Sequence, residues 1–147
     1  MCIRDSPIAD LAVANSDFNF IERLWMDWSP NWPDYESYAK NTINVLSAEN
    51  VLSKALAYYR CTFQESLQAE RINSLAEELM LQKIQMPSLY LHGENDGCIG
   101  ANLSYGMENF FEDLQIKILP DCGHFLHLEK PEEVNNCLLY TSAAADE

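Results

Sequence analysis

Apolar residues in the first half of the chain recur at intervals of three and four residues, which is the period of an amphipathic helix. This pattern predicts four helices, over residues 16–28, 35–46, 48–65 and 69–83. Ser16, at the start of the first helix, and Ser47, just before the third, are the expected capping residues. Between the first two helices, Pro30 and Pro33 interrupt the pattern, because proline does not fit a helix interior.

The pattern changes after residue 86, where short apolar runs alternate with loops. Ser88–Gly93 is an apolar run that ends in glycine, and Gln115–Leu119 is a second run, stopped by Pro120. Both predict buried strands. A helix is expected over residues 100–112, and another begins at Pro131, with glutamates in its first turn. Strand, helix and strand at this spacing predict a right-handed parallel βαβ unit, and therefore an α/β fold class.

Charge and composition exclude several classes of partner. The chain carries 9 Lys and Arg against 23 Asp and Glu, a net charge of −14. This balance argues against binding to nucleic acid or to an anionic membrane surface, because both require clustered basic residues. No apolar run approaches the roughly eighteen residues of a membrane span. The cysteines show no disulfide-framework spacing, so we expect a reduced, cytoplasmic protein.

The two ends of the chain are related to each other in an unusual way. One choice of codons for Met1–Ser6 has a reverse complement that encodes Cys137–Ser142 in a shifted frame. Chance rarely makes one end of a chain the antisense of the other. We therefore predict that residues 1–6 and 137–147 derive from a sequencing adapter, and that the natural sequence is 7–136.

Two ionisable residues follow the predicted strands. Asp96 lies in the Gly-rich loop after the first strand, and His124 lies in the loop after the second. Sites in open α/β sheets lie beyond the carboxyl ends of strands, which are about 4.8 Å apart when adjacent. A buried Asp beside a His fixes the imidazole tautomer and leaves the other ring nitrogen free as a general base. Taken alone, Asp96 is more readily explained as a turn former and His124 as a structural residue.

Other arrangements of reactive residues fit the sequence less well. Gly93–Gly97 has the glycine frame of a nucleophile elbow, but Asn95 stands at the nucleophile position and an amide does not attack. A zinc site would draw on residues whose spacings match no common pattern: Cys98, Cys122, His92, His124 and His127. Cys98 as a thiol nucleophile would lie on the same loop as the acid. We therefore expect no metal and no cofactor.

The combination of motifs resembles a known family. Residues 87–96 resemble the late strand and acid loop of the α/β-hydrolase superfamily, and residues 119–134 resemble its histidine loop and last helix. The resemblance implies that Asp96 and His124 are the acid and the histidine of a catalytic triad. In such enzymes the nucleophile precedes both in chain order. It is therefore expected to be missing from this chain, which alone would be inactive.

The helical half resembles the cap that this family inserts before its last strands, in particular the cap of epoxide-hydrolase-like members. Ala55–Arg60 is similar to a cap segment whose tyrosine protonates the opening epoxide, which implies this role for Tyr59. Ala57 and Tyr58 depart from that segment, and an ordinary helix tyrosine is the alternative. Trp28 and Phe125 are implied to contact substrate, although Trp28 is also explained as cap core.

The resemblance implies a domain division and a function. Residues 7–85 would form the cap, and residues 86–136 the βαβ part of the core. The parent protein would hydrolyse a small to medium, largely apolar molecule, with an epoxide favoured. The alternatives are a serine esterase or lactonase on the same fold, and a non-catalytic ligand-binding relative. The sequence does not predict the oligomeric state.

Overall fold

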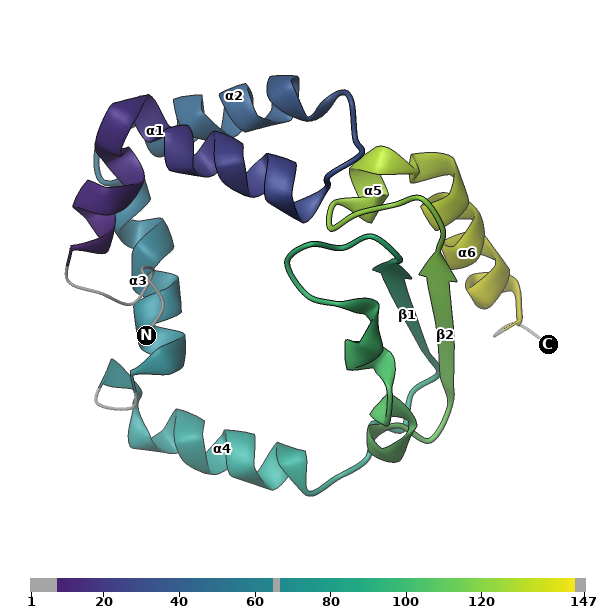
Figure 1. Ribbon diagram of the computed structural model, residues 1–147. Helices are drawn as coiled ribbons and strands as arrows, with labels where there is room; N and C mark the ends of the chain where they lie inside the picture. Colours follow the sequence, from purple (N-terminus) through teal and green to yellow (C-terminus); the bar gives the residue numbers. More distant parts are fainter. Residues whose placement is uncertain (1–7, 65–66, 145–147) are drawn as a thin grey trace. The chain divides into compact units, whose positions relative to one another are not determined.

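The computed structural model describes residues 8–64 and 67–144 (Figure 1). These residues form two compact units, the first from residues up to 25 and 34–81, and the second from 26–33 and from 82 onwards. The first unit is helical. Its elements are α1 (Ala9–Trp28), α2 (Tyr35–Leu46), α3 (Val51–Phe63) and α4 (Glu70–Met80), with the last residues of α1 assigned to the second unit.

The four helices lie where the apolar period predicts them, but α1 begins earlier than expected. Ser16, Asp17 and Phe18 have left-handed backbone angles, so α1 is two helical stretches joined at a kink. The predicted start at residue 16 is this kink. The prediction that Ser47 caps the third helix is wrong. Ser47 instead ends α2, because its hydroxyl donates to the carbonyl of Ile43 at 2.7 Å.

The core of the first unit forms between α1 and α3. Ala9, Val13, Ile21 and Leu56 are buried together, and partly buried residues of α1, α2 and α3 pack around them. An ion pair between Arg60 and Asp10 also ties α3 to α1. The amphipathic period of these helices is therefore explained by one shared apolar interior.

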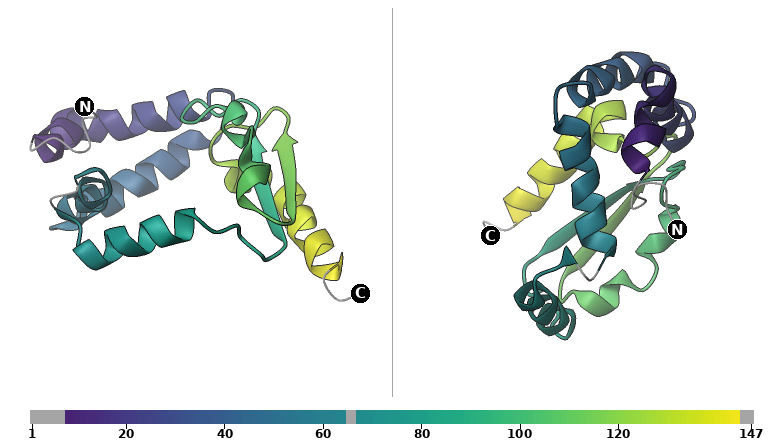
Figure 2. Two further views of the ribbon diagram at one scale, coloured as in Figure 1. Left: turned by 90° about the horizontal axis from the view of Figure 1, so that it is seen from below. Right: turned by 90° about the vertical axis from the view of Figure 1, so that its left-hand side faces the viewer.

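The second unit contains two parallel strands, as predicted. β1 (Ser88–Gly93) pairs with β2 (Leu114–Leu119) in a register that sets Gly93 opposite Leu119. Both strands therefore end at the same edge, and the loops that follow them start side by side. The short helix α5 (Leu126–Glu129) and α6 (Pro131–Ala144) follow β2, and α6 packs beside the strand pair (Figure 2).

The connection between the strands differs from the prediction. The expected helix over residues 100–112 is wrong, since the chain forms two short 3₁₀ helices, η3 (Ala101–Ser104) and η4 (Met107–Phe110). Gly106 lies between them with a φ of +83°, in the left-handed region that a continuous helix cannot contain. The Asn109 side chain also donates to the Gly106 carbonyl, which stabilises this turn rather than a helix.

The predicted adapter segments are only partly described. Residues 1–6 and 145–147 lie outside the described residues, whereas residues 137–144 continue α6. The adapter origin stays a prediction. Within the described ranges, no helix is both long enough and apolar enough to cross a membrane.

Candidate active site

The carboxylate of Asp96 and the imidazole of His124 lie side by side in the second unit, beyond the ends of β1 and β2. The Nδ1 atom of His124 is 2.8 Å from Oδ2 of Asp96, although the two residues are 28 positions apart. The side chain of Asp96 is 6% exposed and that of His124 is 28% exposed. The structure thus brings together the two residues that the sequence predicts as acid and histidine, with the histidine open to solvent.

The loop after β1 holds Asp96 in its ionised form. The Oδ1 atom accepts hydrogen bonds from the amides of Cys98 (2.7 Å) and Ile99 (2.9 Å), while Oδ2 faces His124. Burial alone would raise the pKa of Asp96, but the hydrogen bonds from Ile99, His124 and Cys98 outweigh it. The pKa of this carboxyl is therefore lowered, and the group is an anion at neutral pH.

An ionised acceptor at Asp96 orients His124. A carboxylate only accepts hydrogen bonds, so the neutral ring carries its hydrogen on Nδ1 and keeps the lone pair on Nε2. Within the described part of the chain, the ring makes no hydrogen bond besides the one to Asp96. The arrangement can therefore accept a proton at Nε2 while Asp96 stabilises the resulting imidazolium.

Aromatic rings surround this imidazole. Trp28 meets His124 edge to face at 5.0 Å between ring centroids, and Phe125 does so at 5.2 Å. Trp32 lies against Phe125 at 6.3 Å and is 9% exposed. The predicted substrate-contacting residues Trp28 and Phe125 are thus both placed at the histidine, where they would offer apolar surface to a ligand.

Tyr59, the third predicted substrate contact, belongs to the first unit. It lies on α3, is half-buried, and meets Tyr58 edge to face at 5.9 Å. Its neighbour Arg60 pairs with Asp10 within the same unit. The role of Tyr59 in substrate chemistry stays a prediction.

Residues 26–33 hold the acid loop and the histidine loop together. The backbone carbonyl of Trp28 accepts hydrogen bonds from the amide of Gly97 at 3.1 Å and from the amide of His124 at 3.0 Å. Gly123 approaches Ser29 so closely that an added Cβ would lie 2.6 Å from the Ser29 Cα. Glycine is therefore required there to let the two backbones meet.

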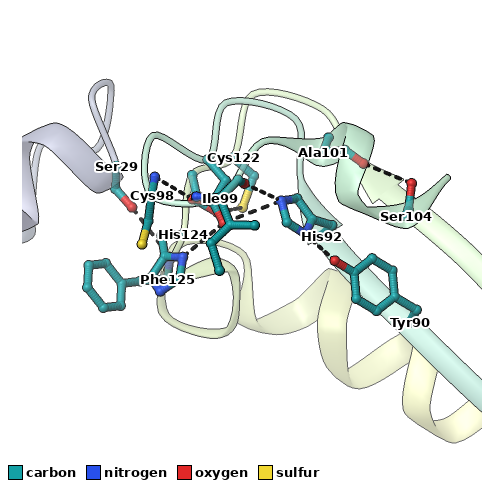
Figure 3. A network of polar contacts seen from close by, with 12 residues as sticks. Ser29, Tyr90, His92, Cys98, Ile99, Ala101, Ser104, Cys122, His124 and Phe125 are labelled. Atoms are coloured by element: carbon teal, nitrogen blue, oxygen red, sulfur yellow. Dashed lines mark hydrogen bonds and ion pairs between the residues drawn. The ribbon is translucent and has the colours of Figure 1, made fainter. Parts of the chain in front are cut away.

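Glu129 is a residue of this site to which the sequence pattern assigns no role. Its Oε1 accepts from the hydroxyl of Ser29 (2.7 Å) and the amide of Phe125 (3.1 Å), and its Oε2 accepts from the amide of Gly123 (2.8 Å). One carboxylate thus binds the amides on both sides of His124. Figure 3 shows Ser29, His124 and Phe125 of this site. The available signal is an acid five residues after the histidine, at the end of α5 and two residues before α6.

Two further groups lie close to the pair. The ring of His92, on β1, contacts the hydroxyl of Tyr90 and the carbonyl of Ile99 (Figure 3). The sequence alone suggests His92 only as a zinc ligand. Cys122 is 1% exposed. Burial, with the nearby Glu129 carboxylate, raises the pKa of its thiol to about 11. Since the thiolate is the reactive form, Cys122 is unsuited to act as a nucleophile.

Comparison with known proteins identifies similar sequences and folds. Bifunctional epoxide hydrolase 2 of Rattus norvegicus is 38% identical over 58 residues, which are 40% of this chain and 10% of that protein. Pimeloyl-[acyl-carrier protein] methyl ester esterase of Nitrosospira multiformis is 34% identical over 71 residues, 47% of this chain and 27% of that protein. The structure of the epoxide hydrolase CorEH without ligand superimposes with a TM-score of 0.75 at 19% identity.

The chain is shorter than the proteins it matches. The superposition on CorEH covers 97% of this chain and 49% of that protein, so the chain spans about half its length. The family described as the alpha/beta hydrolase fold matches residues 44–131, which include Asp96 and His124. The parallel strand pair, the match to the family over residues 44–131 and the superposition on CorEH all indicate the same fold. The chain belongs to the α/β-hydrolase fold family.

Proposed function

We propose that this chain supplies the acid and the histidine of a hydrolytic triad that acts on a small to medium, largely apolar molecule. The observation that carries the proposal is the 2.8 Å contact between Asp96 and His124 beyond the ends of two parallel strands. In this role His124 takes a proton from water at Nε2, and Asp96 stabilises the imidazolium. Residues 7–85 would form the cap region of this fold.

We favour an epoxide as the substrate. A carboxylate nucleophile, carried by a longer protein ahead of this chain, would attack one epoxide carbon and break its bond to oxygen. Tyr59 would donate a proton to that oxygen, and the product is an alkyl ester of the enzyme. Water activated by His124 then hydrolyses the ester. The proposal is supported by the similarity to two epoxide hydrolases and by the apolar rings of Trp28 and Phe125 beside the histidine.

An ester or lactone substrate is the second candidate, and the similarity to a methyl ester esterase favours it. Here the preceding nucleophile is a serine, and His124 removes the proton of its hydroxyl before attack. The acyl-enzyme then forms and is hydrolysed, with backbone amides stabilising the oxyanion. The two candidates differ in when the histidine acts, because a carboxylate nucleophile needs no base for its attack.

The replacement His124→Gln in the longer protein tests the proposal. With an epoxide, the variant should form the alkyl ester but fail to hydrolyse it, so a mass increase equal to the substrate accumulates. With a serine nucleophile, the variant should form no adduct from an ester. The matched control is His127→Gln, since His127 is exposed three residues further on. A His124→Gln protein that retains full turnover would overturn the proposal. A wild-type protein that shows neither turnover nor adduct would indicate a ligand-binding relative.

The chain of 147 residues gives a complementary test. It contains the proposed acid and histidine but no predicted nucleophile, so we expect it to leave epoxides and esters unchanged. Hydrolysis by the chain alone that is lost in His124→Gln would contradict our placement of the nucleophile ahead of it. In the longer protein, Tyr59→Phe should reduce epoxide opening while leaving ester hydrolysis intact. Unchanged epoxide opening would remove Tyr59 from the mechanism.

A further inference from the structure

A second histidine lies next to the acid, near the same carboxylate oxygen that faces His124. His92 is on β1, and its side chain is 7% exposed. Its Nε2 is 2.8 Å from the carbonyl oxygen of Ile99, and its Nδ1 is 2.6 Å from the hydroxyl of Tyr90. The rings of Tyr90 and His92 are stacked at 5.6 Å. A buried imidazole with both nitrogens engaged has one fixed orientation.

The partners of His92 define where its hydrogen lies. The carbonyl of Ile99 can only accept, so Nε2 must be the donor in that contact. In the neutral ring Nδ1 is then an acceptor, and the hydroxyl of Tyr90 donates to it. His92 and His124 therefore hold opposite tautomers around the same carboxylate, with hydrogen on Nε2 in one and on Nδ1 in the other.

The contacts of His92 reach Asp96 by two routes. Ile99, whose carbonyl His92 binds, donates its own amide to Oδ1 of Asp96. The Nε2 atom of His92 also lies 3.4 Å from Oδ2 of Asp96, the oxygen that accepts from His124. The ring thus supports the acid loop from β1 through Ile99, and its Nε2 lies close to the oxygen that orients the proposed base.

We propose that His92 is a positioning residue for Asp96, a role that rests on the proposed function of the Asp96–His124 pair. Its Nε2–H anchors the Ile99 peptide, whose amide donates to Oδ1 of Asp96, and this contact keeps Oδ2 directed at His124. Tyr90 contributes by fixing the tautomer. The titratable groups that face His92 are Tyr90 on the same strand and Asp96 on the loop that follows.

Nuclear magnetic resonance on the 147-residue chain tests this role. Long-range 1H–15N correlation should show the His92 hydrogen on Nε2. His92→Leu should raise the pKa of Asp96 towards its ordinary value, followed through the carboxyl 13C signal, because the acid loses support for its charged form. It should also speed exchange of the Cys98 and Ile99 amides roughly tenfold. His92→Gln, which keeps an N–H near the Nε2 position, should restore both properties.

Two outcomes would overturn the proposal: a His92 hydrogen on Nδ1 in the wild-type chain, or unchanged Asp96 titration in a folded His92→Leu chain. If His92→Leu does not fold, the variants His92→Gln and Tyr90→Phe test the positioning role instead. The first must keep the wild-type titration of Asp96, and the second must lower the fraction of His92 with hydrogen on Nε2. All these measurements are made without substrate. A failure of the adduct experiment would therefore contradict the proposed hydrolysis separately from the positioning role.

Discussion

The hydroxyl of Ser29 donates a hydrogen bond to the carboxylate of Glu129, 100 residues further along the chain, at 2.7 Å. The same carboxylate accepts the amides of Gly123 and Phe125 on either side of His124. The position of the proposed base therefore depends on a serine that follows α1. A charged acceptor with three donors is one of the stronger arrangements in a protein.

Replacing Ser29 by Ala should loosen the histidine loop. Ser29 is 1% exposed, and its loss leaves the half-buried carboxylate of Glu129 with one donor fewer. We expect the free energy of unfolding to fall by about 1–3 kcal/mol, and exchange of the Gly123 and Phe125 amides to accelerate. The control is Ser88→Ala, which removes an exposed hydroxyl bonded to the Met86 carbonyl. Equal effects of the two replacements would contradict the role of Ser29.

Gly123→Ala should destabilise the same contact by a different route. The added Cβ would lie 2.6 Å from both Cα and Oγ of Ser29, so a backbone must move. The expected loss in free energy of unfolding is about 1–3 kcal/mol, measured by urea unfolding. Gly100→Ala is the matched control, because its Cβ would meet the Asn102 side chain, which can rotate away. A Gly123→Ala chain as stable as this control would argue against the close approach.

Stability should depend on acid pH through Asp96. Its pKa is lowered in the folded chain because hydrogen bonds to the carboxylate outweigh burial, so ionisation favours the folded state. This contribution is complete above the ordinary Asp pKa of about 4 and is lost as the pH falls through the lower folded value. The difference in unfolding free energy between wild type and Asp96→Asn should therefore shrink below about pH 4. A difference that stays constant down to pH 2 would contradict this assignment.

Cys122 should resist alkylation in the folded chain. Burial and the Glu129 charge raise the pKa of its thiol to about 11, so at pH 8 only roughly a thousandth of it is thiolate. Cys61 is exposed and serves as the internal control. Mass spectrometry after iodoacetamide treatment should find Cys61 modified and Cys122 unmodified until denaturant is added. Comparable labelling of both in the folded chain would contradict this description of the loop.

The apolar pattern predicts both strands and the four helices of the first half, because apolar residues recur every three or four positions in a helix and form short continuous runs in a buried strand. It places β1 at residues 88–93, and the positions after the strands put Asp96 and His124 near each other. The helix expected over residues 100–112 fails because one left-handed glycine, Gly106, divides it, and sequence period does not show backbone angles.

The supports of the site are less predictable. Ser29 and Glu129 are 100 residues apart, and the Trp28 carbonyl binds two loops far along the chain. Such contacts depend on how elements fold together, and no local period records them. His92 is an intermediate case, since alternation along a strand places it on the same face as Tyr90. Only the structure shows that its ring reaches Ile99 and Asp96.

The tautomer of His124 is the most direct test of the Asp96–His124 pair. Long-range 1H–15N correlation on the 147-residue chain at neutral pH should show the neutral ring with its hydrogen on Nδ1, as donation to Asp96 requires. Asp96→Asn should abolish this preference, whereas Glu94→Gln, at an exposed position of the same loop, should preserve it. A wild-type hydrogen on Nε2, or a preference that survives in Asp96→Asn, would contradict the pair as the orienting element of the site.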